Sequence, residues 1–487
     1  MDIDTRSTHT NRWHISATTA QRVVLVLVIL YIVLFSLASA AKYWWFGQGH
    51  DLSLHHQAIW NTIHGRVFAV TGFVTPTRLF GYDPYLIELL VVPIYALAPS
   101  VHTLFVLQSI ALAMGAPAVW HIGRQVGLPA GLALLMVILY LAYPTVQYTN
   151  LDAFRERSFG LCFFLWAMWA FYQRRWRWFL LCFGLLMICR LEAALFASFF
   201  GVYAFLKGYP WRYRIVPLVL GLGYFFVGNF VLVPLLNQGE PVSYVYDYFQ
   251  PLGHSMSEVI TTAITRPRYT FEQTFTWAKV HYLCLLLLPL AGLPLLGPRE
   301  LVFALPLVAI NLLATKPQLS DVRYWYSTLI VGALMIAAIN GLHWLRQRWA
   351  LTHRQPWLLV MPLLGCMLLS QWLPRNPVIS LVLYHEPPAR VAAAQQLLAI
   401  IPPDARVAAT SRLAPHLVRP FIYYYPLADT VVLPTLDYIA VDTTADWMSD
   451  RSSRQQFHAL RQSDQWQLIF EQQGFQLFQR QPANRPP

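Results

Sequence analysis

Apolar runs of about 20 residues recur through the first three-quarters of the chain, and this feature decides which folds are open to it. A helix of that length spans the hydrocarbon core of a bilayer. Only 12% of the residues are charged, whereas a soluble protein carries about 25%, so the chain cannot cover a soluble surface. We therefore predict an α-helical polytopic membrane protein. An extracellular scaffold, a disordered chain and a nucleic-acid-binding domain are excluded.

The apolar segments predict about 11 transmembrane helices. The stretch 83–99 is also apolar, but its prolines and Glu88 predict a re-entrant or juxtamembrane helix instead. The predicted domains are a cytoplasmic N-terminal segment (1–20), a transmembrane domain (21–373) and a small α/β domain (374–487). The predicted spans lie near 21–41, 101–121, 129–147, 158–173, 177–191, 193–206, 213–236, 280–295, 301–314, 327–344 and 356–373, with a first outer loop at 42–100 and a long outer loop at 237–278.

Basic residues predict the orientation of these helices. The chain has 35 Lys and Arg against 23 Asp and Glu, and cytoplasmic loops are the ones that collect Lys and Arg. With the N-terminus in the cytoplasm, the cytoplasmic loops are the more densely basic. We therefore predict a multi-pass protein of the cytoplasmic (inner) membrane with its C-terminal domain outside. The net charge of +12 then serves orientation in the bilayer and does not indicate a nucleic-acid partner.

The C-terminal residues 374–487 contain no apolar span and alternate between helix and strand patterns. They hold no GxGxxG and no P-loop, so nothing supports nucleotide binding. The five cysteines all lie in apolar runs without a CxxC pair, so neither a zinc site nor a disulfide framework is indicated. The predicted elements are helices at 389–401 and 453–462, a short helix in SRLAPHLVR, strands at 405–410, 421–425 and 438–442, and a hairpin at 466–480.

Acidic residues upstream of this domain gather on the predicted outer face. Acids contribute little to topology, so an outward-facing chemical site would explain the bias; longer outer loops are the alternative. The first outer loop begins GHDLSLHHQAIWNTIHGRVF, whose apolar spacing predicts an interfacial helix. Asp51 lies at its start and shares a face with His55. Asp51 is either a general base or metal ligand with His55 or His56 beside it, or merely the N-cap of the helix.

Three further clusters combine acids with arginines. NLDAFRERSF (150–159) offers Asp152 and Glu156 as a carboxylate pair with Arg155 as a phosphate ligand, or it is a solvated loop whose charges neutralise each other. CRLEAAL (189–195) places Arg190 and Glu192 between two apolar halves, where ionisable groups are costly and usually functional. SDVRYWYS (320–327) brings Arg323 and Tyr324 to the outer end of a span, where belt anchoring explains the aromatic residues equally well.

The chain resembles a family of uncharacterised prokaryotic membrane proteins, the domain of unknown function numbered 2079. The resemblance covers roughly residues 20–345 and rests on HDLSLHHQAIWNTIHGRVF, DPYLIELLVVPIYAL, YPTVQYTNLDAF, RLEAAL, LGHS and ALPLVAINLLA, with PPDARVAATSRLAPHL in the tail. That family in turn resembles the C-type glycosyltransferases, which use polyprenyl-phosphate sugar donors. The sequence departs from the family pattern, with Gly81, Arg155 and Tyr324 where histidines are expected and Leu191 where an acid is expected.

The resemblance implies a membrane glycosyltransferase that moves a sugar from a polyprenyl-phosphate carrier to a glycan, lipid or protein acceptor at the outer face. Asp51 then takes the place of the essential acid after the first span. Alternatives are a transporter or flippase, or a non-catalytic assembly subunit, for lipid-linked saccharides. The expected catalytic residues are Asp51, Asp152 and Glu156, with a divalent cation (Mg or Mn) as a candidate cofactor at Asp51. The expected substrate-binding residues are His55, His56, Asp83, Arg155, Arg190, Glu192, Arg323 and Tyr324.

Overall fold

A computed structural model describes residues 15–72, 78–237, 248–349, 357–383, 385–428 and 430–481. Most of these residues are helical, and a small sheet lies near the C-terminus, which confirms the predicted class of helical membrane protein with a C-terminal α/β region. Most of the predicted N-terminal segment, residues 1–14, lies outside the described residues.

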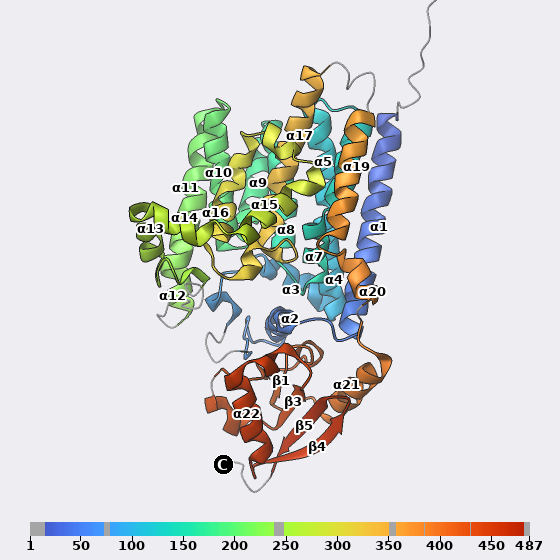
Figure 1. The fold of residues 1–487 in the computed structure, drawn as a ribbon, viewed down its shortest axis with the longest axis vertical. Coiled ribbons are helices and arrows are strands. Elements are labelled where there is room, and N and C mark those ends of the chain that lie inside the picture. Colours follow the sequence, from blue (N-terminus) through green and yellow to red (C-terminus); the bar gives the residue numbers. More distant parts are fainter. Residues whose placement is uncertain are drawn as a thin grey trace, which may run out of the picture.

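The helices form a bundle at one end of the molecule (Figure 1). In the described part of the chain, five helical segments are long and apolar enough to span a membrane, or six if one bent pair counts as a single span. The five are α1 (Ala17–Trp44), Val101–Val126 (α4 Val101–Ala113 and α5 Gly115–Val126), Trp211–Leu236 (α11 Trp211–Val227, η2 Gly228–Leu232 and α12 Val233–Leu236), Trp325–Arg348 (η8 Trp325–Ser327 and α17 Thr328–Arg348) and Trp357–Leu383 (α19 Trp357–Trp372 and α20 Pro377–Leu383).

The bent pair is α6 (Ala130–Leu141) and α7 (Pro144–Leu151), which meet at 42°. Several apolar helices are shorter than a full span. They are α3 (Glu88–Leu97), α8 (Arg157–Tyr172), α9 (Trp176–Met187), α10 (Leu191–Leu206), α15 (Trp277–Leu287) and α16 (Leu305–Leu313). The predicted spans therefore coincide with helices, and five of them, among the described residues, have the length and composition that a membrane span needs.

Helix α17 lies at the centre of the bundle, and almost all of its first 15 residues are buried. Its small residues explain this position, because they let neighbouring backbones approach closely. A Cβ atom added at Gly341 would lie 2.3 Å from the carbonyl oxygen of Leu293. The lipid-facing surface is supplied instead by helices such as α1, where Leu25, Ile29 and Leu37 are exposed.

The C-terminal region (385–481) forms a five-stranded sheet in the order β2-β1-β3-β5-β4. The strand β1 pairs in parallel with β2 and β3, and the other pairs are antiparallel. The predicted helices and strands are all present, except that SRLAPHLVR contains only one turn of 3-10 helix. The elements are α21 (Pro388–Ile400), β1 (Val407–Ala409), η9 (Ala414–His416), β2 (Ile422–Tyr424), β3 (Tyr438–Asp442), α22 (Arg451–Gln462), β4 (Trp466–Gln472) and β5 (Phe475–Arg480).

Helix α2 (His50–Ile63) lies between the bundle and the C-terminal region (Figure 1). The predicted helix is present, and residues 52–59 are all buried, so over this stretch neither face is open to solvent. The physical reason is that α2 has protein on both sides. One hydrophobic core joins Leu52 and Ile59 of α2 to Val407 and Ile422 of the sheet.

The predicted long loop 237–278 is not simply irregular, because it contains α13 (Met256–Thr265) and α14 (Pro267–Thr274).

Candidate active site

The Asp51 side chain lies at the start of α2. Gly49 is the N-cap of this helix and makes no side-chain cap bond, so the interpretation of Asp51 as the cap is wrong. Asp51 lies in the first turn, where the helix dipole favours a negative charge. Its Oδ2 accepts a hydrogen bond from Nη2 of Arg155 at 2.7 Å, and its Oδ1 lies 3.3 Å from Nε2 of His50. The carboxylate is therefore held at both oxygens.

Arg155 joins two of the predicted acids. Its Nη2 also donates to Oδ2 of Asp152 at 2.7 Å, and its guanidinium lies 3.2 Å from the ring centroid of Trp325. Burial alone would raise the pKa of Asp51, but Arg155 above all, with His50, brings it well below its usual range. Asp51 is therefore ionised at neutral pH. Residues 104 positions apart in the chain meet here.

Glu156 belongs to a second group of charges. It accepts hydrogen bonds from Nη1 of Arg157 at 3.2 Å and from Nη1 of Arg190 at 3.1 Å. Because α7 ends at Leu151 and α8 begins at Arg157, no helix turn pairs Asp152 with Glu156, and the predicted carboxylate pair is absent. The solvated-loop alternative is also wrong, since Glu156 is only 1% exposed.

The second group extends to two more predicted residues. Arg157 donates from Nε to Glu192 at 2.6 Å, and Nε of Arg190 lies 3.2 Å from Oδ2 of Asp83. Burial would raise the pKa of Glu156, but Arg190 and Arg157 lower it to about 2. Burial also acts on Asp83, and there it prevails over Arg190, so that the pKa of Asp83 rises to about 6. The network thus contains one strongly ionised acid and one that titrates near neutral pH.

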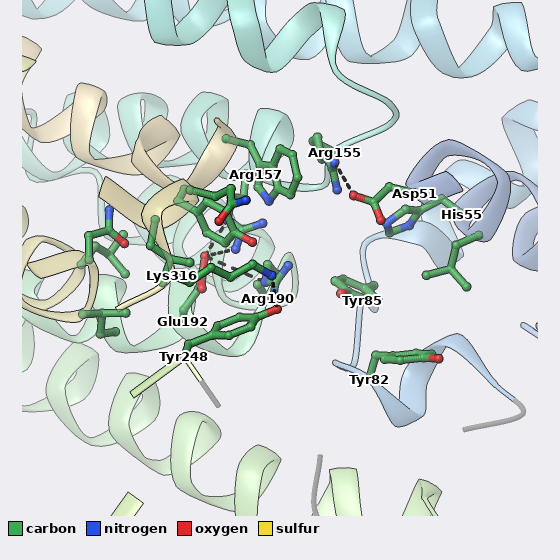
Figure 2. A pocket seen from close by; sticks show the side chains of 18 of the residues that line it. Asp51, His55, Tyr82, Tyr85, Arg155, Arg157, Arg190, Glu192, Tyr248 and Lys316 are labelled. Carbon is green, nitrogen blue, oxygen red and sulfur yellow. Dashed lines mark hydrogen bonds and ion pairs between the residues drawn. The ribbon is translucent and has the colours of Figure 1, made fainter. Parts of the chain in front are cut away.

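Several of these residues line a cavity of about 600 Å³ (Figure 2). Asp83, Asp152 and Glu156 are not among the lining residues and pair with arginines that are. Asp51, His55 and Arg155 lie on one side, and Arg157, Arg190, Glu192, Lys316 and Tyr248 lie on the other. Tyr85 contributes an aromatic wall, and the Arg190 guanidinium lies 5.3 Å from its ring centroid. The cavity therefore offers two carboxylates, several cations and aromatic faces within one space.

His55 faces this cavity because a buried acid holds it there. Its Nδ1 lies 2.6 Å from Oε1 of Glu88, which is fully buried. Burial lowers the pKa of His55, but the Glu88 carboxylate raises it above the usual value overall. The sequence suggested only that Glu88 makes 83–99 a poor span; the structure shows that it positions a cavity-lining histidine.

Four predicted binding residues, His56, Asp83, Arg323 and Tyr324, do not line this cavity. Asp83 pairs with the lining residue Arg190. His56 is buried against Tyr95, with 2.7 Å between Nε2 and the Tyr95 hydroxyl. Arg323 pairs with Asp321 and lines a separate cavity of about 830 Å³. Tyr324 packs beside Trp325. Arg323 and Trp325 are two positions apart in the chain, yet they line different cavities.

Lys316 is a cavity residue that the sequence analysis missed. Its Nζ lies 3.0 Å from the Tyr248 hydroxyl and 4.1 Å from the centroid of that ring. No carboxylate forms an ion pair with it among the residues that the structure describes. Burial lowers the pKa of Lys316, yet Tyr248 raises it overall, so the amine is charged. In the sequence, the only sign of a role for Lys316 is its position between two apolar segments. Because lysines are common in loops, that position did not single it out.

The residues around Asp51 do not fit the divalent cation that we expected there. Within the described ranges, no group of three or more His, Cys, Asp or Glu side chains is placed to bind a metal ion. The immediate partners of Asp51 are the cation Arg155 and His50, and Mg²⁺ or Mn²⁺ prefers several oxygen ligands. Because Arg155 already pairs with the Asp51 carboxylate, we assign no step to a metal.

A bundle of apolar helices with a charged cavity defines the class of this chain, which is a helical membrane protein with a C-terminal sheet. All residues that line the cavity lie between His50 and Tyr326. The chain belongs to the family described as "Predicted membrane protein (DUF2079)", whose model matches residues 42–477. No curated protein matches the chain.

Solved structures resemble this fold over most of its length. ArnT from Cupriavidus metallidurans bound to undecaprenyl phosphate has a TM-score of 0.54 at 13% identity, covering 95% of this chain and 99% of ArnT. Its apo state has a TM-score of 0.51 at 13% identity, covering 94% and 99%. The Archaeoglobus fulgidus oligosaccharyltransferase tethered with an acceptor peptide has a TM-score of 0.44 at 12% identity, covering 86% and 69%. The expected resemblance to C-type glycosyltransferases is thereby confirmed at the level of the fold.

Proposed function

We propose that this protein transfers a sugar from a polyprenyl-phosphate carrier to an acceptor at the outer face of the membrane. The supporting observation is the cavity that holds Asp51 opposite Lys316 and Arg190. A transferase of this kind needs a group that orients the acceptor hydroxyl and cations that stabilise the departing phosphate. The similar fold of ArnT, solved with undecaprenyl phosphate, supports a lipid phosphate as the donor.

In this proposal Lys316 is the principal phosphate ligand. Among the residues that the structure describes, no carboxylate forms an ion pair with Lys316, whereas Arg155 and Arg190 are each shared by acids. A cation already paired with carboxylates has less charge to offer an incoming phosphate. Arg190 and Arg157 complete the cationic wall.

Asp51 orients the acceptor in the transfer step. A bond forms between the acceptor oxygen and the anomeric carbon while the bond from that carbon to the phosphate oxygen breaks, releasing polyprenyl phosphate. The hydroxyl proton passes along its hydrogen bond to Asp51 and on to water. Because the pKa of Asp51 is held low, this carboxylate is a weak base. Its main contribution is therefore alignment of the hydroxyl and stabilisation of positive charge at the anomeric carbon.

The function is tested with the lipids of a deletion strain. The purified protein in nanodiscs is mixed with a lipid extract from that strain, and mass spectrometry follows polyprenyl-phosphate sugars and free polyprenyl phosphate. We expect the sugar-bearing lipid to be consumed and the free lipid phosphate to appear. Binding of undecaprenyl phosphate without any turnover would contradict the enzyme and favour a transporter or an assembly subunit.

Removing the Lys316 charge should weaken donor binding. We expect Lys316→Ala to bind undecaprenyl phosphate about 10-fold more weakly, the scale of one lost hydrogen bond to a charged group. Titration of the lipid into protein in nanodiscs, followed by native mass spectrometry, measures this. The matched control is Arg268→Ala, because Arg268 is 93% exposed on α14 and is not among the residues that line the cavity. If both variants bound the lipid equally well, Lys316 would not be a ligand of the lipid phosphate.

Protonation of Asp83 should strengthen the same binding. Its pKa is raised to about 6, so Asp83 is mainly ionised at pH 7 and gains a proton as the pH falls through 6. Arg190 then loses an ionised partner, and the cavity wall becomes more positive. Between pH 7 and 5 we expect the wild-type protein to gain about threefold in affinity relative to Asp83→Asn, the scale of a partly screened charge pair. The variant shares the titration of the lipid phosphate, so parallel curves would contradict the prediction.

The proposed orientation places the N-terminus in the cytoplasm and the C-terminal region outside. A reporter enzyme that is active only outside the cytoplasm, fused after Pro487, should be active. The same reporter fused within the loop at Arg174, between α8 and α9, should be inactive. If both fusions were well expressed and showed the opposite pattern of reporter activity, the proposed orientation would be wrong. The site would then lie at the inner face of the membrane.

A further inference from the structure

Ser411 of the C-terminal region touches the residue that precedes Asp51. The backbone N–H of His50 donates to Oγ of Ser411 at 3.1 Å, and Nδ1 of the same histidine lies 3.3 Å from Oγ. Ser411 stands 361 positions away in the chain. The other ring nitrogen, Nε2, lies 3.3 Å from Oδ1 of Asp51. A continuous chain of polar contacts therefore runs from the C-terminal region to the Asp51 carboxylate.

When the His50 ring is neutral, the geometry favours one arrangement of protons along this chain. Oγ of Ser411 already accepts from the His50 backbone, so its hydroxyl hydrogen is available to the lone pair of Nδ1. A neutral imidazole that accepts at Nδ1 carries its proton on Nε2. That N–H then points toward Asp51 and donates to it. The opposite tautomer would set a lone pair against a carboxylate.

Several contacts fix Ser411 in this place. It follows the carboxyl end of β1, the strand flanked in parallel by β2 and β3, where the loops of such sheets gather side chains. The Tyr424 hydroxyl at the end of β2 donates to the His50 carbonyl at 3.0 Å. Thr71 of the first loop bonds to both N–H and C=O of Ile422 through its hydroxyl, at 2.8 Å each. The shared hydrophobic core of α2 and the sheet prevents the two from separating freely.

We propose that Ser411 is a positioning residue for the transfer reaction: it sets the orientation and tautomer of His50, which in turn holds one oxygen of Asp51. The bundle holds the other oxygen through Arg155. The C-terminal region thus completes the site, and it acts on the reaction without touching substrate. This role rests on the proposed function for its effect on turnover, whereas the contact itself can be tested separately.

The test compares Ser411→Ala, Ser411→Thr and Ser463→Ala. The threonine variant keeps the hydroxyl group. The control, Ser463→Ala, removes a serine of the same region whose hydroxyl oxygen accepts a hydrogen bond from the backbone N–H of Gln465. Carbethoxylation of His50 by diethyl pyrocarbonate, read by peptide mass spectrometry, reports whether the imidazole is held, and the exposed His64 serves as the internal reference. Turnover of the deletion-strain lipid extract gives kcat and KM.

In the Ser411→Ala variant, we expect diethyl pyrocarbonate to modify His50 several times faster than in the wild type. The modification rate of His64 should stay the same. The kcat of Ser411→Ala should fall roughly threefold to tenfold, the effect of one hydrogen bond, at an unaltered KM. Ser411→Thr should restore both values, and Ser463→Ala should match the wild type. An unchanged His50 modification rate would overturn the proposal, and so would faster modification with unchanged kcat. If the wild type turns over no lipid, the transferase itself fails, and the modification rates still decide whether Ser411 holds His50.

Discussion

Replacing Asp51 with asparagine is expected to lower turnover of the lipid-linked sugar by about 100-fold or more, the range seen when a group that stabilises the transition state is removed. Asparagine keeps the shape of the side chain and removes its charge. Arg155 and His50 then face a neutral amide instead of a carboxylate. The acceptor hydroxyl loses its anionic partner, and positive charge at the anomeric carbon is no longer stabilised.

The variant should remain folded, because Asp51 does not cap its helix and its side chain is one-third exposed (33%). Size-exclusion chromatography and an unchanged melting temperature establish folding before the kinetics are measured. The matched control is Asp446→Asn, an exposed acid at the start of η11 (Asp446–Ser449) in the C-terminal region. Wild-type turnover by Asp51→Asn would refute the assignment of this residue.

Glu156 carries the largest expected effect on stability. We expect Glu156→Gln to lower the free energy of unfolding by about 3 kcal/mol, because removing one partner of a buried ion pair leaves an uncompensated charge. Glu156 is 1% exposed and accepts hydrogen bonds from Arg157 and Arg190. Glu192 and Asp83 still balance these arginines in part, which keeps the loss at the lower end of the usual range. Thermal unfolding in detergent measures the change.

The control for Glu156 is an ion pair of similar length on the surface. Arg268 and Glu272 pair at 3.0 Å on α14, with side chains 93% and 55% exposed. Solvent screens such a pair, so Glu272→Gln should leave the melting temperature unchanged. A Glu156→Gln protein as stable as the Glu272→Gln protein would mean that water reaches the buried network.

The pKa of Glu156 also predicts how this stabilisation depends on pH. Its folded pKa of about 2 lies below the usual value, so the contribution is fully present at neutral pH. It is lost as the pH falls from the unfolded value of about 4.3 toward 2. The stability difference between wild type and Glu156→Gln should therefore shrink over that interval and stay constant above it.

Much of the fold follows from local patterns. Apolar runs predict helices because a membrane leaves backbone polar groups no partner except one another. Alternating residues and turn signals predict the strands of the C-terminal region, and the structure contains them. The burial of α2 on both sides was not predicted, because its apolar spacing describes one face and its second partner, the sheet, lies more than 340 residues further along the chain.

Some residues of the candidate site can likewise be predicted from local sequence, and others cannot. Asp51, Arg155 and Arg190 could be nominated because charges beside apolar segments are costly and therefore informative. Lys316, Glu88 and Ser411 could not, because each takes its meaning from a partner distant in sequence: Tyr248, His55 and His50. Conversely, Arg323 carries a suitable charge in a suitable place along the chain, yet its backbone directs it toward Asp321 and another cavity.

By itself the sequence determined that this chain is a helical membrane protein with a C-terminal α/β region and acids concentrated near one end of its spans. Composition and periodicity are enough for that, because each apolar segment must find a bilayer or a core whatever its neighbours are. Only the tertiary structure decided that Asp51 and Asp152 share Arg155, that Glu156 belongs to a separate network, and that the sheet completes the site through His50. Charge pairing depends on distances of about 3 Å between side chains, and only the folded chain sets those distances.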